Sequence, residues 1–239
     1  MQTAAVRVDA TEDLFTPIHK GLRSMIYSLA SRIQSNDFGD LPASTALAVD
    51  MEHDFELARA AGCIVCILHH HAEDEEKQIF PAVSEFGPGL VAALIEEHHE
   101  LTRRETTLTT RAREILAMER AADRIRAGEQ LNRSANDLFA LYVAHMNRED
   151  NDLVPLMRRH FTNEQMAAMR GAILAGMPPE RLLAILGWML PSLAAFELAD
   201  LMGALKRGAP PPLVEAVAKI ASAKVEPARW ERVRREVGL

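Results

Sequence analysis

Apolar residues return every three or four positions over long stretches of this chain, and that spacing predicts helices with one buried face. The clearest stripe predicts a helix from about Thr16 to Ser35, with Pro17 in its first turn, where a missing N–H does no harm. Residues 36–40 contain asparagine, aspartate and glycine, so they predict the turn that ends this helix. The stripe consists of Leu14, Ile18, Leu22, Met25, Ile26, Leu29 and Ile33.

The same spacing predicts three more long helices before residue 160. Four long helices with short connections favour an all-α fold, an up-down four-helix bundle, in whose core facing side chains can build a metal site. The three helices are expected from between Pro42 and Glu52 to a kink or stop at Pro81, over residues 90–126, and over residues 129–159 after a turn at Gly128.

Shorter apolar segments divided by prolines follow the fourth helix. Thr162 and Gln165 have the spacing of a capping box, which predicts the start of a new helix. We therefore expect two parts, the bundle over residues 12–160 and a helical C-terminal extension over residues 161–239. An apolar face on residues 182–205 is expected to cover the bundle, and a dimer contact is the alternative, so the choice between monomer and homodimer stays open.

The composition agrees with a helical fold and limits the partners. Of the 239 residues, 48% are hydrophobic but only 5% are aromatic, and residues that favour helices abound. The net charge is -7 and the 27 basic residues are spread along the chain, which argues against a nucleic-acid surface. There is no signal-peptide layout, and the apolar stretches are too short or too interrupted to cross a bilayer, so we expect a cytoplasmic protein without membrane contact.

A pattern of charged residues occurs twice. His71 is followed four residues later by Glu75, and His145 is followed four residues later by Glu149. In both copies a second acid follows the glutamate, and a proline stands six residues after the glutamate. Residues four apart lie on one face of an α-helix, so each copy directs an imidazole and a carboxylate at the same point. One such pair is common on solvated helix faces, but two copies on apolar helices favour a shared site.

The first and third helices each offer one histidine at the end that faces these pairs, and the two halves look like a duplicated helix pair. Imidazoles and carboxylates are ligands suited to iron, and also to manganese or zinc. If both glutamates bridge two octahedral ions and a hydroxide is shared, two coordination positions stay open for a small molecule. The candidate metal ligands are His19, His71, Glu75, His98, His145 and Glu149.

Several neighbours of these residues are further candidates. Tyr142 stands three residues before the histidine of the second pair, where its phenol is either a catalytic group at an open metal position or a core tyrosine with a satisfied hydroxyl. Acids beside a ligand can orient its imidazole. The candidates for such supporting positions are Glu76, His99, Asp150 and Tyr27, and for His99 a surface position is the alternative.

The only two cysteines, Cys63 and Cys66, are spaced like a redox or metal-binding pair. The apolar residues around them predict the middle of a buried helix, whereas an activated thiol stands at an exposed helix N-terminus. We therefore favour buried, small hydrophobic side chains over a redox motif.

At this point the residues resemble a known family. The order is His19, His71-x3-Glu75, His98 and His145-x3-Glu149, with a proline after each pair. This order is similar to that of the hemerythrin-like (HHE cation-binding) domain, and the similarity covers about residues 12–160. The resemblance implies a non-haem di-iron centre with a bridging oxo or hydroxo group in a four-helix bundle, with zinc or manganese as alternative metals. The rest of the chain resembles an extension found in some bacterial members.

Two features depart from the oxygen-carrying members of that family. Those members have a His-x3-His pair on the third helix, whereas Thr102 stands four residues after His98 and Leu94 stands four before it. Their last block is usually His-x4-Asp, whereas here a glutamate follows at x3 and Asp150 is the x4 alternative. A missing histidine opens a coordination position, which disfavours stable oxygen carriage.

The expected function is therefore reaction with a small oxidant, such as peroxide, O2 or nitric oxide, at a site of four histidines and two glutamates. If the protein is an enzyme, we expect a di-iron oxidoreductase that consumes peroxide or nitric oxide, like a catalase or peroxidase. The alternatives are a sensor or iron-binding protein without turnover and a structural bundle that holds zinc.

Overall fold

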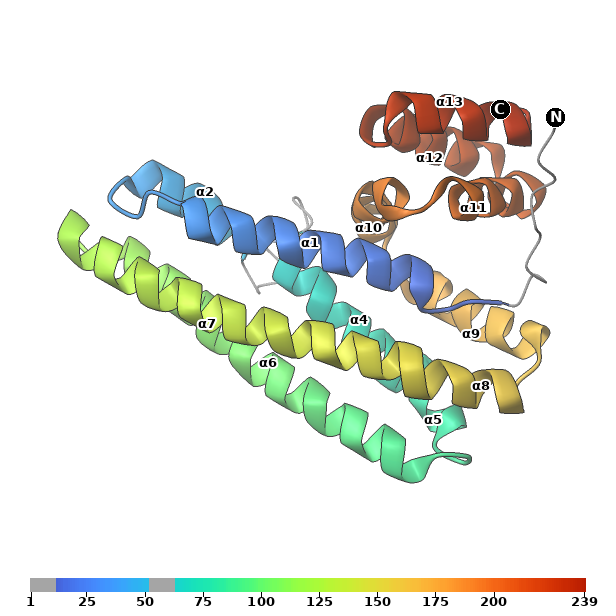
Figure 1. Cartoon of the computed structure of the whole chain (residues 1–239), viewed down its shortest axis with the longest axis horizontal. Coiled ribbons are helices and arrows are strands. Elements are labelled where there is room, and N and C mark those ends of the chain that lie inside the picture. The colour runs from blue at the N-terminus through green and yellow to red at the C-terminus, as the bar shows by residue number, and fades with distance from the viewer. Residues whose placement is uncertain (1–11, 52–62) are drawn as a thin grey trace.

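The computed structural model describes residues 12–51 and 63–239, and these ranges contain helices and no strand. The longest helices run side by side along the molecule (Figure 1). The all-α bundle expected from the sequence is thereby confirmed. The bundle helices are α1 (Thr16–Ser35), α4 (Ile64–Gln78), α6 (Pro88–Leu116) and α7 (Ala121–Arg148).

Shorter elements complete the bundle. The segment after α7 continues it without a break in direction (Figure 1). The short elements are α2 (Leu41–Asp50), α5 (Phe80–Val83), the π-helix η1 (Glu149–Leu153) and α8 (Val154–His160).

The predicted bounds of α1 are confirmed, but those of the second helix are confirmed only in part. The expected helix through the first His-x3-Glu pair contains α2 and α4, and the stretch between them lies outside the described residues. Helix α4 ends at Gln78, and Pro81 stands in the first turn of α5, where its missing N–H costs no helical hydrogen bond.

The predicted turn at Gly128 is wrong. The chain turns earlier, between α6 and α7, and Gly128 lies buried inside α7. A Cβ atom at this position would stand 2.2 Å from the ring of Phe38, so the glycine is required by close packing. A glycine inside a helix and a glycine in a turn look the same in sequence, because both follow from the missing side chain.

The true turn is held by Arg124, which is buried near the start of α7. Its guanidinium donates to the carbonyls of Met118 and Glu119 in the turn, at 3.0 and 3.1 Å. It also donates to the carbonyls of Phe38 and Gly39 in the connection between α1 and α2, at 3.2 and 2.6 Å. One side chain thereby joins two loops at the end of the bundle.

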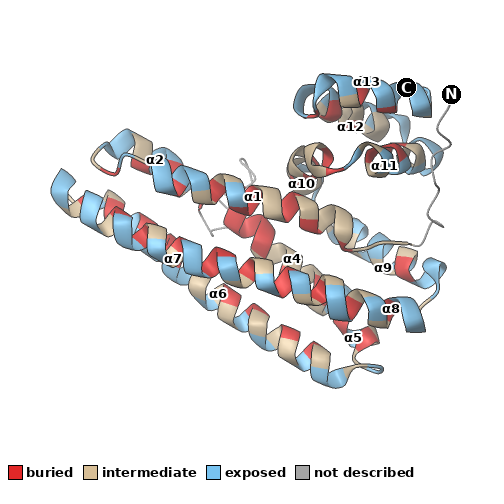
Figure 2. Cartoon of the chain, viewed as in Figure 1, coloured by how far each residue is buried: buried red, intermediate tan, exposed pale blue. Residues whose placement is uncertain are grey.

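The apolar core of the bundle is divided into two clusters. One cluster contains residues of all four bundle helices, among them Leu22, Leu68 and Leu101. The other contains Phe15, Phe80 and residues of the first turns of α6, of η1 and of α8. Figure 2 shows the buried positions as bands along the facing sides of the helices. The part of the bundle interior that lies between the two clusters is therefore enclosed by apolar side chains on both sides.

The C-terminal helices are α9 (Asn163–Gly176), α10 (Pro179–Ser192), α11 (Ala195–Gly208), α12 (Pro211–Lys224) and α13 (Pro227–Val237). Helices α10 to α13 lie together beside α1 (Figure 1) and have an apolar cluster of their own, whereas α9 packs against α4 and adds Met166 to the cluster of Phe15 and Phe80. The bounds of these helices agree with the predicted breaks, and the Thr162–Gln165 capping box is present. A division into two domains at residue 160 stays a prediction.

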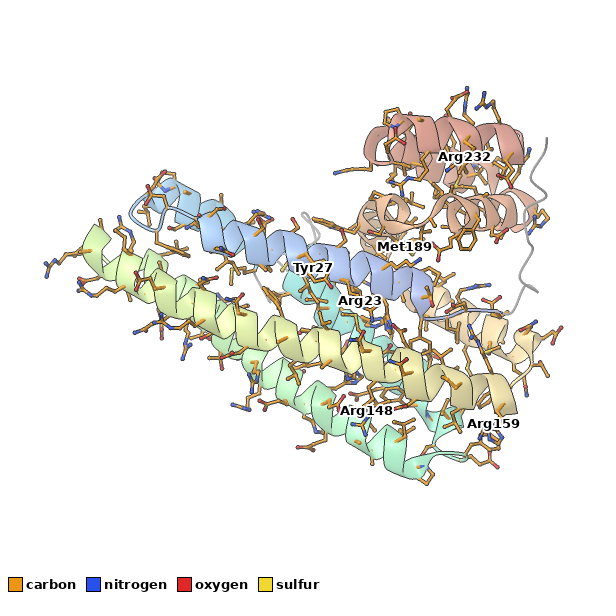
Figure 3. The ribbon with its side chains drawn as sticks, viewed as in Figure 1. Arg23, Tyr27, Arg148, Arg159, Met189 and Arg232 are labelled. Atoms are coloured by element: carbon orange, nitrogen blue, oxygen red, sulfur yellow. The ribbon has the colours of Figure 1, made fainter. Side chains whose placement is uncertain are left out.

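Close packing and ion pairs hold this extension against the bundle. A Cβ atom on Gly21 of α1 would lie 3.0 Å from the Cα atom of Met189, so α1 and α10 touch through backbone at this point (Figure 3). Lys20 pairs with Glu197 at 2.5 Å. The extension thus covers α1, as expected from its apolar face. Among the described residues, no helix is long and apolar enough to cross a membrane.

We expect Arg124→Leu to lower the free energy of unfolding by about 2–4 kcal/mol, because four carbonyl groups lose a charged donor. Urea unfolding followed by circular dichroism measures this change. The matched control is Arg126→Leu, since Arg126 is exposed and pairs only with its helix neighbour Asp123 among the described contacts. Equal, small effects of both substitutions would contradict the role given to Arg124.

Candidate metal centre

A cluster of imidazoles and carboxylates lies between the two apolar clusters of the bundle. Its members are buried, except that the side chain of His71 is 15% exposed. The structure brings all the predicted ligand residues together here. They are His19 from α1, His71 and Glu75 from α4, His98 from α6, His145 from α7 and Glu149 from η1.

The first group of ligand atoms joins α1, α4 and η1. The Nε2 atom of His71 lies 3.0 Å from Oε1 of Glu75. The Nε2 atom of His19 lies 3.3 Å from Oε2 of Glu149 and 4.0 Å from Oε1 of Glu75. One ligand atom from each of the four residues lies within 4.8 Å of the others, which is close enough for all four to contact one cation.

The second group uses the same two carboxylates. The Nε2 atom of His98 lies 3.4 Å from the other oxygen of Glu75, Oε2, and the Nε2 atom of His145 lies 3.3 Å from the other oxygen of Glu149, Oε1. These four residues also offer ligand atoms within 4.8 Å of one another. Each glutamate thus presents one oxygen to each group, which is the arrangement of two bridging carboxylates between two cations.

The donor atoms fit bound cations better than they fit one another. Both oxygens of Glu75 and of Glu149, with Nε2 of His19 and of His71, are buried without a hydrogen bond of good geometry among the described residues. Buried polar atoms without partners are costly. The Nε2 atoms of His98 and His145 lie 2.9 Å apart, so neutral imidazoles that both carry their proton on Nδ1 would point two lone pairs at each other. Cations at the two groups would satisfy all of these atoms.

Carboxylates outside the cluster hold three of the four imidazoles. Each of these imidazoles directs Nδ1 at an acid, and a neutral imidazole that donates from Nδ1 keeps the Nε2 lone pair for a metal. The pairs are His19 with Asp150 at 2.8 Å, His98 with Glu76 at 2.8 Å and His145 with Glu97 at 2.7 Å.

Basic residues support two of these acids in turn. Arg23 donates to Asp150 at 2.7 Å, and Arg148 donates to Glu97 at 2.5 Å. The arginines lie on α1 and α7, where Figure 3 labels them. They hold the acids in place while the imidazoles keep their inward orientation.

The π-helix η1 explains how two adjacent acids, Glu149 and Asp150, both serve the site. In η1 the backbone N–H of Val154 bonds to the carbonyl of Glu149, five residues earlier, which widens the helical turn. Glu149 enters the cluster, and Asp150 bonds to Nδ1 of His19. Glu149, at the x3 position after His145, therefore faces the two groups of ligand atoms. Asp150, at the x4 position, contacts His19 from outside the cluster.

Opposite charges inside the cluster shift its pKa values. Burial alone would lower the pKa of His19 and of His145, but hydrogen bonds to carboxylates and the charge of Glu149 raise both to about 9. Burial, together with the charge of Glu75, would raise the pKa of Glu149, yet the two neighbouring imidazoles lower it. Burial would likewise raise the pKa of Glu75, but the charge of His71 holds it well below its usual value. The cluster without metal thus holds protons on imidazoles and charge on carboxylates.

Two predicted supporting residues lie away from the site. Tyr27 is 58% exposed on α1, and the side chain of His99 is 67% exposed and pairs with Glu96. The prediction of supporting roles for these two residues is therefore not met by their positions. Helical spacing explains this result, since His99 is about 100° around the helix from His98 and Tyr27 is about two turns from His19.

The structure adds two acids that the sequence did not suggest, Glu97 and Glu105. Glu97 bonds to a histidine on another helix, so only the register between α6 and α7 reveals it. Glu105 is buried and accepts a hydrogen bond from Tyr142, so that the phenol is bonded to this acid. Glu105 stands seven residues after His98, or about two turns on the same face, and this spacing was a usable signal.

The two cysteines are buried, as expected, but their predicted position in the middle of a helix is wrong. Cys63 is the N-cap of α4, and its sulfur accepts a 3.5 Å hydrogen bond from the N–H of Cys66. The stretch before Cys63 lies outside the described residues.

Fold and site together define a helical bundle with a buried cluster of histidines and glutamates that can hold two cations. The sequence profile of the hemerythrin HHE cation binding domain matches residues 11–157, so the chain belongs to that family. Comparisons with curated proteins and with solved structures give no match. Family membership supports cation binding by the bundle, typically of iron.

If each group holds one metal ion, Glu75→Gln should empty both groups, since this carboxylate presents an oxygen to each, whereas His71→Ala should empty mainly its own group. Elemental analysis of iron per chain measures the difference. His99→Ala is the control and keeps the wild-type content, because its side chain is exposed. Equal losses in the glutamate and histidine variants would contradict the bridging arrangement.

The stability of the metal-free protein should fall as the pH rises from about 6.5 to about 9. The folded chain holds protons on His19 and His145 more tightly than the unfolded chain, so their contribution is full below 6.5 and is lost as the pH passes through about 9. The expected loss is on the order of 3 kcal/mol for each of the two histidines, measured by urea unfolding at several pH values. The double variant His19→Gln/His145→Gln should lose most of this slope, and a flat wild-type curve would contradict the assignment.

Proposed function

We propose that the bundle holds two iron ions and that the iron-loaded protein reacts with hydrogen peroxide. The proposal is supported mainly by the way Glu75 and Glu149 are shared between two groups of ligand atoms. His19 and His71 would hold one ion and His98 and His145 the other, with both glutamates bridging. Bound iron would supply one-electron redox steps and coordination positions open to a small oxidant.

The protein's own residues would set how this centre works. Four neutral imidazoles and two carboxylates leave two ferrous ions with a net positive charge of about two, which favours bound anions and acidifies bound water. The acids bonded to Nδ1 of three ligand histidines increase the basicity of these ligands and fix their orientation. Phe80 stacks on His98 at 5.4 Å, and Phe15 stands edge-on to His19, so the apolar cluster at this end keeps water away.

His71 marks the side from which a small oxidant would enter. Its side chain is 15% exposed, whereas the other ligand side chains of the cluster are at most 3% exposed. On α6, the positions one turn from His98 are Leu94 and Thr102, neither of which is an imidazole. The proposed ligand set therefore leaves positions unfilled, which supports reaction with peroxide over stable binding of oxygen.

A second candidate function is sensing, in which the state of the centre is passed to the extension. It is supported by the contact between Gly21 and Met189, two residues from the ligand His19, and by the ion pair between Lys20 and Glu197. Both contacts join the helix that carries a ligand to the C-terminal helices. In a sensor, oxidation would occur once and would change the packing of α10 on α1.

The test is a stopped-flow measurement of peroxide consumption by anaerobic, iron-loaded protein with excess peroxide. We expect many equivalents of peroxide to be consumed per chain, and Glu149→Gln, with iron added back, to be slower by about 100-fold. Zinc-loaded protein is the control for a structural role and should be inactive. Consumption of about one equivalent would favour the sensor, and no oxidation of the iron would contradict the proposed function.

A further inference from the structure

The bundle core contains a second buried polar group beside the metal cluster. Glu105, from the middle of α6, is 1% exposed. Its Oε1 atom accepts a hydrogen bond from the hydroxyl of Tyr142, and its Oε2 atom lies 3.3 Å from Nδ1 of His69. The three residues come from α6, α7 and α4, so they form a bridge across the interior of the bundle.

Burying this polar group costs more free energy than a purely structural contact would justify. A buried carboxylate loses its hydration, and well-packed apolar side chains of similar size often serve stability equally well or better. Neighbouring positions on the same helix face, such as Leu101 and Leu108, are filled by leucine. The acid and the phenol therefore call for a chemical explanation.

The pair of Tyr142 and Glu105 lies next to the metal cluster. Tyr142 precedes the ligand His145 by one turn of α7, about 4.5 Å of rise, and Glu105 follows the ligand His98 by about two turns of α6. The two helices pack against each other along their length. Burial, the charge of Glu105 and, more weakly, the charge of Glu75 raise the pKa of Tyr142 well above its usual value, so the field of a bridging carboxylate reaches the phenol.

A buried phenol is a poor electron donor unless its proton leaves with the electron. The oxidised phenol is a strong acid, and a charged radical cation in an apolar core would be costly. A carboxylate already hydrogen-bonded to the hydroxyl removes this obstacle, because the proton moves only across the existing hydrogen bond. His69, on the other oxygen of Glu105, helps to hold the carboxylate in that orientation.

We propose that Tyr142 is a redox-active tyrosine that gives one electron to peroxide reduction at the metal centre while its phenolic proton passes to Glu105. This inference rests on the proposed function. One hydrogen peroxide takes two electrons and two protons and gives two waters. When one of the two iron ions is already ferric, the bound iron would supply only one electron, and Tyr142 supplies the other and becomes a neutral radical. The two protons come from solvent, and Glu105 ends in its protonated form.

The chain offers a sharp control because it contains only two tyrosines. Tyr142 is buried and bonded to an acid, whereas Tyr27 is 58% exposed on α1. We would mix the half-oxidised protein, with one ferrous and one ferric ion per chain, with one equivalent of hydrogen peroxide, freeze samples at successive times and record electron paramagnetic resonance spectra. Optical spectra would follow iron oxidation in parallel, and elemental analysis would give the iron content of each variant.

A tyrosyl signal is expected in wild type and in Tyr27→Phe, and it should be lost in Tyr142→Phe at unchanged iron content. A signal that persists in Tyr142→Phe would overturn the inference. Iron oxidation without any tyrosyl signal in wild type would also overturn it and leave the proposed function standing. If the iron is not oxidised at all, the inference about Tyr142 and the proposed function are both contradicted.

Glu105→Gln separates proton acceptance from simple packing. Glutamine keeps the size of the side chain and an oxygen that can accept the hydrogen bond, but it does not take up the proton. The radical should therefore form about 100-fold more slowly, the lower end of the effect of a positioned base. Wild-type radical kinetics in Glu105→Gln would show that Glu105 does not accept the proton and would overturn that part of the inference.

Discussion

The structure depends on two glutamates that face each other in the core of a helical bundle. Glu75 and Glu149 are buried, and their four oxygens make no good hydrogen bond among the described residues. Two carboxylates in such a place repel each other and lose their hydration, so they persist only beside positive charge. Without metal that charge is a proton on a neighbouring imidazole, and bound cations would supply it in the proposed centre. Metal binding there would therefore displace protons.

The surrounding structure keeps these carboxylates and imidazoles in position. Acids outside the cluster orient three histidines, arginines hold two of those acids, and the π-helix lets adjacent acids serve two different tasks. Apolar clusters on both sides exclude water from the same level of the bundle. The contact of Gly21 with Met189 joins the C-terminal helices to the helix that carries His19. Each of these features stabilises one arrangement of ligand atoms.

Much of this architecture could be predicted from the sequence, because helix periodicity and the repeated His-x3-Glu pair are local signals. The bounds of α1 and of the C-terminal helices follow from apolar spacing, capping residues and prolines. The turn before α7 was misplaced because the contact between Gly128 and Phe38 joins distant parts of the chain. Glu97 and the bond between Tyr142 and Glu105 depend on the register between α6 and α7, which no single helix encodes.

The central claim is that each of the two glutamates binds both metal ions. A crystal structure of iron-loaded protein, with anomalous diffraction data collected at the iron absorption edge, tests it most directly. Two iron peaks are predicted, each in contact with one oxygen of Glu75 and one oxygen of Glu149. A single peak, or an iron bound by Asp150 in place of Glu149, would contradict the account.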